Sequence, residues 1–154
     1  MREEKLHQTH SVVILLAEDD EDDYELCAEA FRESHLLNQL HRVTNGEDLL
    51  DYLRHEGRYT DLHAAPTPSL ILLDLNMPRK DGREALVEIK AHPDLRRIPV
   101  VVLTTSKAEE DVLQIYNLGV SSFIRKPVTF DGLCEIVRAI NHYWFDIVEL
   151  PPEA

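Results

Sequence analysis

Apolar residues follow one another almost without interruption at three places along the chain. The runs cover residues 12–17, 70–75 and 98–103, and within them only Asp74 and Pro99 are not aliphatic. Runs of this length are typical of strands buried on both faces of a parallel sheet, where apolar and polar residues need not alternate. Residues 36–43 alternate in part and predict a strand at a sheet edge, and residues 120–125 predict a short last strand.

Apolar residues at helical spacing follow each predicted strand. They are Tyr24, Cys27, Ala28 and Phe31; Leu49, Leu50 and Leu53; Ala85, Leu86 and Ile89; Val112, Leu113, Ile115, Tyr116 and Leu118; and Leu133, Val137, Ile140, Trp144 and Ile147. Five strand–helix repeats predict an α/β fold, in which helices cover both faces of a parallel sheet through right-handed crossovers. Residues 55–68 form a longer connection than such folds usually contain, and we interpret them as an insertion or an interaction loop.

Asp74 is the residue that the central apolar run does not explain. A carboxylate inside an apolar strand costs several kcal/mol unless it is paired, metal-bound or placed at the strand's end. Pro78 cannot continue a strand, and the turn residues that follow it, up to Gly82, end the run close to Asp74. Asp74 is therefore expected at the carboxyl end of its strand, where α/β sheets bind ligands. Taken alone, it could equally cap a loop or pair with a surface lysine.

The ends of the other predicted strands carry the remaining candidate residues. Glu18 and Asp19 follow the first strand, Thr104 ends the fourth and Lys126 follows the fifth. In a parallel sheet these ends meet at one edge, and clustered carboxylates repel one another unless a cation neutralises them. Mg²⁺ favours such oxygen ligands. With the charges balanced, Asp74 could attack a phosphoryl group while Lys126 offsets charge on the transferring oxygens. Acids 20–23 are explained as the first turn of a helix.

Composition limits the classes of function. The chain has 154 residues, 44% of them hydrophobic, which suits one domain with a full core. A net charge of −13 opposes binding to nucleic acids. No apolar run approaches the roughly 20 residues that span a bilayer, so we expect a soluble, cytoplasmic protein. Cys27 and Cys134 lack the paired spacing of a metal or redox motif and are expected in the core.

Four motifs, taken in order, resemble the receiver domain of two-component response regulators. They are Glu18-Asp19, Asp74 to Pro78 with Asp81-Gly82, Thr104-Thr105, and Phe123 three residues before Lys126-Pro127. The resemblance covers residues 12 to about 140 and implies the flavodoxin-like doubly wound (βα)5 fold, with strand order 2-1-3-4-5. We expect the receiver domain at residues 11–147 with an extended last helix, a flexible N-terminus at 1–10 and a tail at 148–154.

The resemblance also implies a role for each site residue. Asp74 would accept a phosphoryl group from a histidine kinase, and Lys126 would be the counter-ion of the phosphate. Mg²⁺ would be bound by Asp19, Asp74 and the backbone carbonyl of Asn76 directly, and by Glu18 through water. Thr104 and Phe123 would form a switch pair that shifts the population of two states after phosphorylation. The peptide bond before Pro127 is expected to be cis.

A closer resemblance concerns the outer parts of the chain. The long loop before Pro68, residues 96–106 and residues 144–151 look like the single-domain regulators that partner bacterial phytochrome kinases. This implies a homodimer, for which Tyr116, Tyr143, Trp144 and Ile147 are the expected interface residues. Only three residues follow Pro151 and Pro152 is among them, so we expect no output domain. Signalling would then proceed through an unidentified downstream protein, or the chain would act as a phosphate sink or relay.

Two other functions remain open from the sequence. A Mg²⁺-dependent phosphohydrolase can also form an aspartyl phosphate, but such enzymes need a second aspartate where this chain has Asn76. A pseudo-receiver would act as a constitutive interaction module, although no pocket residue is missing that would favour this interpretation. As a receiver, the protein would catalyse only its own phosphorylation and dephosphorylation.

Overall fold

Five parallel strands form one sheet. The computed structural model describes residues 12–33, 38–104 and 109–147. The strands lie in the order β2-β1-β3-β4-β5, and each neighbouring pair is parallel. Their bounds are β1 (Val12–Ala17), β2 (Asn38–Val43), β3 (Leu70–Leu73), β4 (Val100–Thr104) and β5 (Ser122–Arg125). The predicted strand order 2-1-3-4-5 is confirmed.

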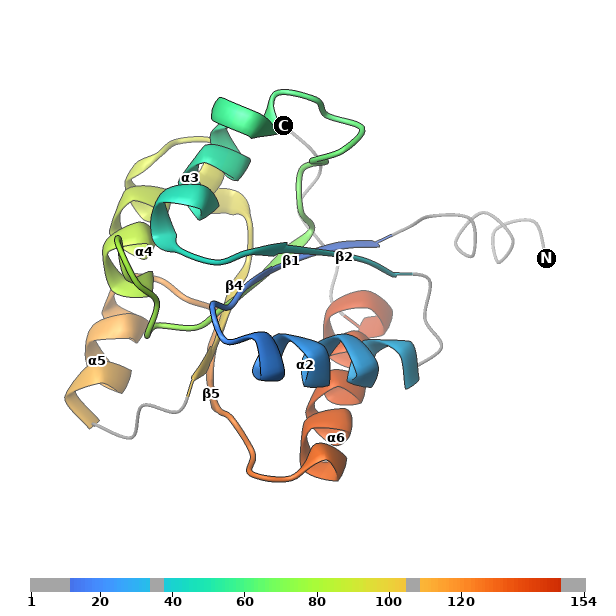
Figure 1. The fold of residues 1–154 in the computed structure, drawn as a ribbon. Helices are drawn as coiled ribbons and strands as arrows, with labels where there is room; N and C mark the ends of the chain where they lie inside the picture. The colour runs from blue at the N-terminus through green and yellow to red at the C-terminus, as the bar shows by residue number, and fades with distance from the viewer. Residues whose placement is uncertain (1–11, 34–37, 105–108, 148–154) are drawn as a thin grey trace.

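Helices cover both faces of the sheet. They are α2 (Glu21–Glu33), α3 (Gly46–Arg54), η1 (Gly57–Tyr59), α4 (Gly82–Ala91), η2 (Leu95–Arg97), α5 (Glu109–Asn117), α6 (Phe130–Asn141) and η3 (His142–Ile147). Helices α2 and α6 lie side by side on one face, and α3, α4 and α5 lie on the other (Figure 1). After α6 the chain continues directly into η3, which is a π-helical turn. Within the described ranges, no helix is long and apolar enough to cross a membrane.

Strand β3 contributes to the core on both faces. Leu70 and Leu72 pack in the cluster that includes α2 and α6, while Ile71 and Leu73 pack in the cluster that includes α3 and α4. All four side chains are fully buried. Because burying one such side chain contributes about 1.5 to 3 kcal/mol, this strand anchors both helical layers. Asp74 follows directly and is held at the sheet's carboxyl edge.

Both cysteines belong to the core between the sheet and the pair of helices α2 and α6. Cys27 and Cys134 are free and buried, as the sequence predicts. Burial raises the pKa of the Cys27 thiol to about 12, so this group stays protonated near neutral pH. These residues therefore act as small apolar core side chains.

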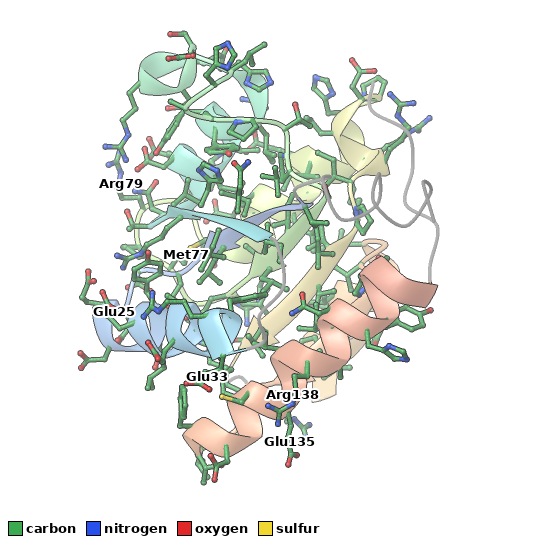
Figure 2. All side chains as sticks on the ribbon, turned by 90° about the vertical axis from the view of Figure 1, so that its right-hand side faces the viewer. Glu25, Glu33, Met77, Arg79, Glu135 and Arg138 are labelled. Atoms are coloured by element: carbon green, nitrogen blue, oxygen red, sulfur yellow. The ribbon has the colours of Figure 1, made fainter. Side chains whose placement is uncertain are left out.

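The loop after β3 is tied to the start of α3. The amide of Gly46 donates to the carbonyl of Lys80 at 2.7 Å, and a Cβ at Gly46 would lie 2.2 Å from that oxygen. Only glycine allows this approach. Arg79 extends from the same loop toward α3 and donates twice to Glu47, at 3.3 and 3.1 Å (Figure 2). The loop that begins at Asp74 is thus held at its far end by another element.

The long connection before β3 packs against α3. The hydroxyl of Tyr52, on α3, donates to the carbonyl of Pro66 at 2.8 Å, and Ala65 beside it is buried. The rings of Tyr52 and Tyr59 lie 5.2 Å apart in a tilted arrangement. Burial raises the pKa of Tyr52 to about 12, which keeps the hydroxyl available as a donor. The loop is therefore an ordered covering of α3 at this point.

We expect Tyr52→Phe to lower the free energy of unfolding by about 1 kcal/mol. The substitution removes one hydrogen bond and leaves the partly buried carbonyl of Pro66 without its donor, while the ring packing remains. Urea denaturation measures the change. Tyr143→Phe is the matched control because Tyr143 is 52% exposed. Equal effects of the two substitutions would contradict the role of the Tyr52 hydrogen bond.

The peptide bond between Lys126 and Pro127 is trans. Among the described residues no peptide bond is cis, so the expectation of a cis bond at Pro127 is wrong for this structure. The trans form of such bonds is favoured by about 0.5 to 1 kcal/mol, and local packing has to overcome this preference. The side chain of Val128, immediately after Pro127, is fully exposed and supplies no such packing.

Candidate functional site

The carboxyl edge of the sheet brings the predicted residues together. Glu18 and Asp19 lie just after β1, Asp74 just after β3, Thr104 at the end of β4 and Lys126 just after β5. Glu18, Asp74 and Thr104 are buried, whereas Asp19 is exposed. The predicted meeting of these residues at one edge is confirmed. Buried Glu18 and Asp74 thus lie beside exposed Asp19, and we call this cluster the acidic pocket.

Lys126 lies among three carboxylates. Its Nζ donates a close hydrogen bond to Glu18, lies 3.0 Å from Oδ2 of Asp23 and lies 3.5 Å from Oδ2 of Asp74. Burial alone would lower the pKa of this lysine. The hydrogen bond to Glu18 and the charge of Asp74 outweigh burial and raise the pKa above its ordinary value. Lys126 is thus a permanent cation inside the acidic pocket.

Glu18 is the most buried acid of the site, with a side chain that is 1% exposed. Burial raises its pKa to about 7, and the charge of Asp74 acts in the same direction, while the hydrogen bond from Lys126 opposes them. Its second oxygen accepts from the amide of Asp20 at 3.2 Å. Glu18 therefore changes charge near neutral pH.

The two oxygens of Asp74 have different surroundings. Oδ1 accepts from the hydroxyl of Thr104 at 2.9 Å and from the amide of Asn76 at 3.1 Å. Oδ2 lies on the side of Lys126. The side-chain amide of Asn76 donates to the Thr104 hydroxyl at 3.4 Å, which completes a short chain of polar contacts. The carboxylate is thus fixed through Oδ1, and Oδ2 is directed toward the pocket.

Three of the acids can share a cation. Glu18, Asp19 and Asp74 each offer a carboxylate oxygen, and these oxygens lie within 4.8 Å of one another. Carboxylate oxygens are the ligands that hard divalent cations prefer, so the donor set fits such an ion. A cation here would share Glu18 and Asp74 with the ammonium of Lys126. The backbone carbonyl of Asn76 stays a predicted ligand.

Comparison with known proteins identifies this arrangement. Residues 14–138 match the family model of the response regulator receiver domain. The chain belongs to the response regulator receiver family. The matched range runs from β1 into α6 and contains every residue of the acidic pocket, so the receiver identity predicted from the sequence is confirmed.

Relatives of this receiver cover nearly all of its chain. Response regulator Rcp1 of Synechocystis sp. is 44% identical over 139 residues, which are 90% of this chain and 92% of Rcp1. The crystal structure of the phosphorylated cyanobacterial phytochrome response regulator RcpA has a TM-score of 0.86 and 43% identity, covering 93% of this chain and 100% of that one. The crystal structure of the Mn²⁺-bound form of Rcp1 has a TM-score of 0.83 and 43% identity, and the match covers 92% of this chain and 99% of that one.

We expect the site to bind divalent cations less tightly as the pH falls below about 7. Because burial raises the pKa of Glu18 to about 7, this carboxyl is neutral below that pH and ionised above it. Divalent cations favour the ionised form, so binding at pH 6 must release a proton. Calorimetric titration with Mg²⁺ at pH 6 and pH 8 measures both effects. Glu18→Gln should remove most of the difference, and a wild-type affinity that is equal at the two pH values would contradict this expectation.

The residues predicted for switching and for dimerisation lie around β5. Phe123 is partly buried, and its amide donates to the hydroxyl of Tyr116 at 3.1 Å. Tyr143 and Trp144 form an edge-on ring pair with centroids 5.3 Å apart. They border a groove of about 470 Å³ between the β5 segment and α6. The side chain of Ile147 lies outside the described part of the chain.

Two residues of the site were not predicted from the sequence. Asp23 was interpreted as part of the helix start, yet it contacts Lys126 from the first turn of α2, while Asp20 accepts from the amide of Asp23 and so caps that turn. Arg42, on β2, donates to the backbone carbonyls of Glu18 and Asp19. The sequence offered only a partial signal for Arg42, because it lies one residue before the end of the strand predicted at residues 36–43, while its contacts depend on the register of β2 against β1.

Proposed function

We propose that this receiver accepts a phosphoryl group on Asp74 from a histidine kinase, in a Mg²⁺-dependent reaction, and signals through contacts with other proteins. The observation that carries the proposal is the setting of Asp74. Oδ1 is held by Thr104 and Asn76, while Oδ2 faces Lys126 inside a pocket that also contains the cation-binding acids. An oriented carboxylate beside a fixed positive charge is what attack on phosphorus requires.

The transfer forms a bond between a carboxylate oxygen of Asp74 and phosphorus, and breaks the bond between phosphorus and the donor's leaving group. Lys126 offsets negative charge on the transferring oxygens. A bound divalent cation supplies further charge neutralisation of the same kind. The Thr104 hydroxyl donates to Asp74 in this structure, and in the phosphorylated protein it would donate to a phosphoryl oxygen instead. We infer that this change, with Phe123 as its partner, shifts the receiver between two states.

Intact-mass spectrometry after incubation with acetyl phosphate tests the proposal. The wild type should gain one phosphoryl group in the presence of Mg²⁺ and none after chelation of the metal, and Asp74→Asn should gain none. Thr104→Val serves as a second variant, because it keeps the acceptor but loses the hydroxyl. If the wild type gains no group and releases no inorganic phosphate, the proposed function is wrong.

The partner kinase is proposed to be of the phytochrome type. RcpA, which aligns over 93% of this chain, is a phytochrome response regulator, and this supports the assignment. A cytoplasmic location is part of the same proposal. Hydrolysis of other phosphate esters is not favoured, because Asn76 stands where a hydrolase needs an acid and its amide instead donates to Thr104. Catalysis would thus be limited to the receiver's own phosphorylation and dephosphorylation.

We further propose that the receiver forms a homodimer through the face around β5 and α6. Tyr116 and Tyr143 are 47% and 52% exposed, and Tyr143 and Trp144 border the groove described above. Large exposed aromatic side chains beside an apolar groove are typical of contact surfaces. Sedimentation of the wild type and of Tyr143→Glu should show a dimer and a monomer, respectively. Val87→Glu on α4 is the control, since Val87 is equally exposed elsewhere.

A further inference from the structure

Arg42 connects the edge strand of the sheet to the acidic turn. Its Nε donates to the carbonyl of Glu18 at 3.0 Å, and its Nη2 donates to the carbonyl of Asp19 at 3.3 Å. Nη1 lies 2.9 Å from a carboxylate oxygen of Glu21, and the guanidinium carbon stands 4.4 Å from the centre of the Tyr24 ring. The Arg42 side chain is only 19% exposed. All three guanidinium nitrogens are therefore directed at the turn between β1 and α2.

These contacts differ from those of an ordinary surface arginine. An exposed ion pair leaves the side chain mobile. Here the planar guanidinium of Arg42 donates to two consecutive backbone carbonyls, and the Tyr24 ring packs against one of its faces. The β2 backbone adds a bond of its own, because the carbonyl of Val43 accepts from the amide of Glu18 at 3.0 Å. Residues of β2 thus bind both the amide and the carbonyl of Glu18.

The two carbonyls belong to the two residues whose carboxylates form the cation site with Asp74. Fixing successive peptide groups fixes the direction in which both side chains leave the backbone. Residues that orient metal ligands in this way strongly affect metal affinity although they never touch the metal. We propose that Arg42 is a positioning residue of the cation site and acts through the backbone of Glu18 and Asp19. Its effect on phosphorylation rests on the proposed function, while its effect on cation binding does not.

Charge and positioning predict opposite effects of removing Arg42. As a nearby positive charge, Arg42 repels a divalent cation, so its loss would tighten cation binding. As a positioning group it holds the ligands in place, so its loss would weaken binding. Lysine at this position keeps the charge but lacks the planar fork, and therefore cannot hold both carbonyls. The variants Arg42→Gln and Arg42→Lys separate the two effects.

The test measures Mg²⁺ affinity calorimetrically for the wild type, Arg42→Gln, Arg42→Lys and Arg32→Gln. Arg32 is the control because it pairs on the surface with Glu29 and its removal changes the net charge equally. We expect both Arg42 variants to bind Mg²⁺ about tenfold more weakly, in the range that loss of ligand-orienting groups produces. Arg32→Gln should bind like the wild type. In metal-free protein, the Asp20 amide, which donates to Glu18, should exchange its hydrogen faster in both Arg42 variants.

Phosphorylation by acetyl phosphate provides a further readout. The Mg²⁺ concentration that gives half the maximal rate should rise in both Arg42 variants, while the rate at saturating Mg²⁺ stays near that of the wild type. A merely structural role would reduce the active fraction without moving the half-saturating concentration. Should Arg42→Gln fail to fold, Arg42→Lys carries the test.

The outcomes separate the two proposals. Tighter Mg²⁺ binding by Arg42→Gln, or wild-type affinity in Arg42→Lys, would overturn the positioning role. Weaker binding by both variants would support it, even if the wild type takes up no phosphoryl group. In that last case the proposed function would fail while the assignment of Arg42 to the cation site stands.

Discussion

Lys126→Met should destabilise the metal-free protein by about 3 kcal/mol, at the low end of the cost of removing one partner from a buried ion pair. The Lys126 side chain is 11% exposed and is the cation shared by Glu18, Asp23 and Asp74. Without it, the fully buried Glu18 has no charged partner and must hold its proton more tightly. Thermal and urea unfolding at pH 8, in the presence of a chelator, measure the loss.

The pH dependence follows from the direction of the Glu18 shift. When folding raises the pKa of a carboxyl, the folded protein loses stability as the pH rises from the pKa of the unfolded chain to the pKa of the folded protein. Loss of Lys126 raises the pKa of Glu18 in the folded protein further. The gap in stability between the wild type and Lys126→Met should therefore be wider at pH 8 than at pH 6, where Glu18 is protonated in both proteins.

Lys80→Met is the control for Lys126→Met, since it removes another lysine that pairs with a glutamate, but at the surface. It should leave the unfolding midpoint almost unchanged. Adding Mg²⁺ should raise the midpoint of Lys126→Met more than that of the wild type, because the acids no longer bind an ammonium. This account of the pocket would be contradicted if Lys126→Met lost as little stability as Lys80→Met. It would also be contradicted if Mg²⁺ raised the unfolding midpoint of Lys126→Met no more than that of the wild type.

Gly82→Ala should lower the free energy of unfolding by about 3 kcal/mol, the upper part of the range for overpacked sites. A Cβ on Gly82 would lie 2.5 Å from the carbonyl oxygen of Asp74 and 2.8 Å from the Cα of Leu75. Both atoms are backbone and cannot turn aside as a side chain can. Because the displaced segment carries the acceptor, the rate of phosphoryl uptake from acetyl phosphate at saturating Mg²⁺ should fall as well.

Gly132→Ala is the matched control, because Gly132 also lies in the first turn of a helix. The nearest atoms to a Cβ there lie farther away, at 3.0 Å, and belong to the side chains of Pro127 and Thr129 and not to the backbone. Alanine also favours a helix by about 1 kcal/mol over glycine, which offsets the tighter contact. We expect near wild-type stability and uptake for this variant. If Gly82→Ala also has near wild-type stability and uptake, the backbone after Asp74 can shift to make room for the Cβ and the prediction is wrong.

Much of the fold could be predicted because the central strands are unambiguous. The runs at β1, β3 and β4 have no polar alternation, so they require cover on both faces, and this excludes most other arrangements. The π-helical end of the last helix could not be predicted, because its apolar spacing fits an α-helix equally well. The dipeptide Asn45-Gly46 by itself predicts only a turn. Its glycine is needed because the carbonyl of Lys80 approaches from a loop far along the chain.

The site was predicted in its main parts for a similar reason. In a parallel sheet the residues at strand ends meet at one edge, so Glu18, Asp74 and Lys126 could be brought together without knowing any contact. Asp23 could not be recognised, since a helix start explains an acid at that position equally well. Arg42 required the register of β2 against β1, which places it opposite Leu16. The error at Pro127 came from the resemblance to receivers, because nothing in the local sequence distinguishes the two isomers.

The place of β1 inside the sheet has a consequence for the newly made chain. β1 pairs with β2 on one side and with β3 on the other, but β3 is synthesised well after β2. At about 5 to 20 residues per second, one edge of β1 stays open for a few seconds on the ribosome. Its six residues are all apolar and include no charge that would discourage pairing with another chain. We therefore expect protection of this edge during translation to raise the yield of folded receiver.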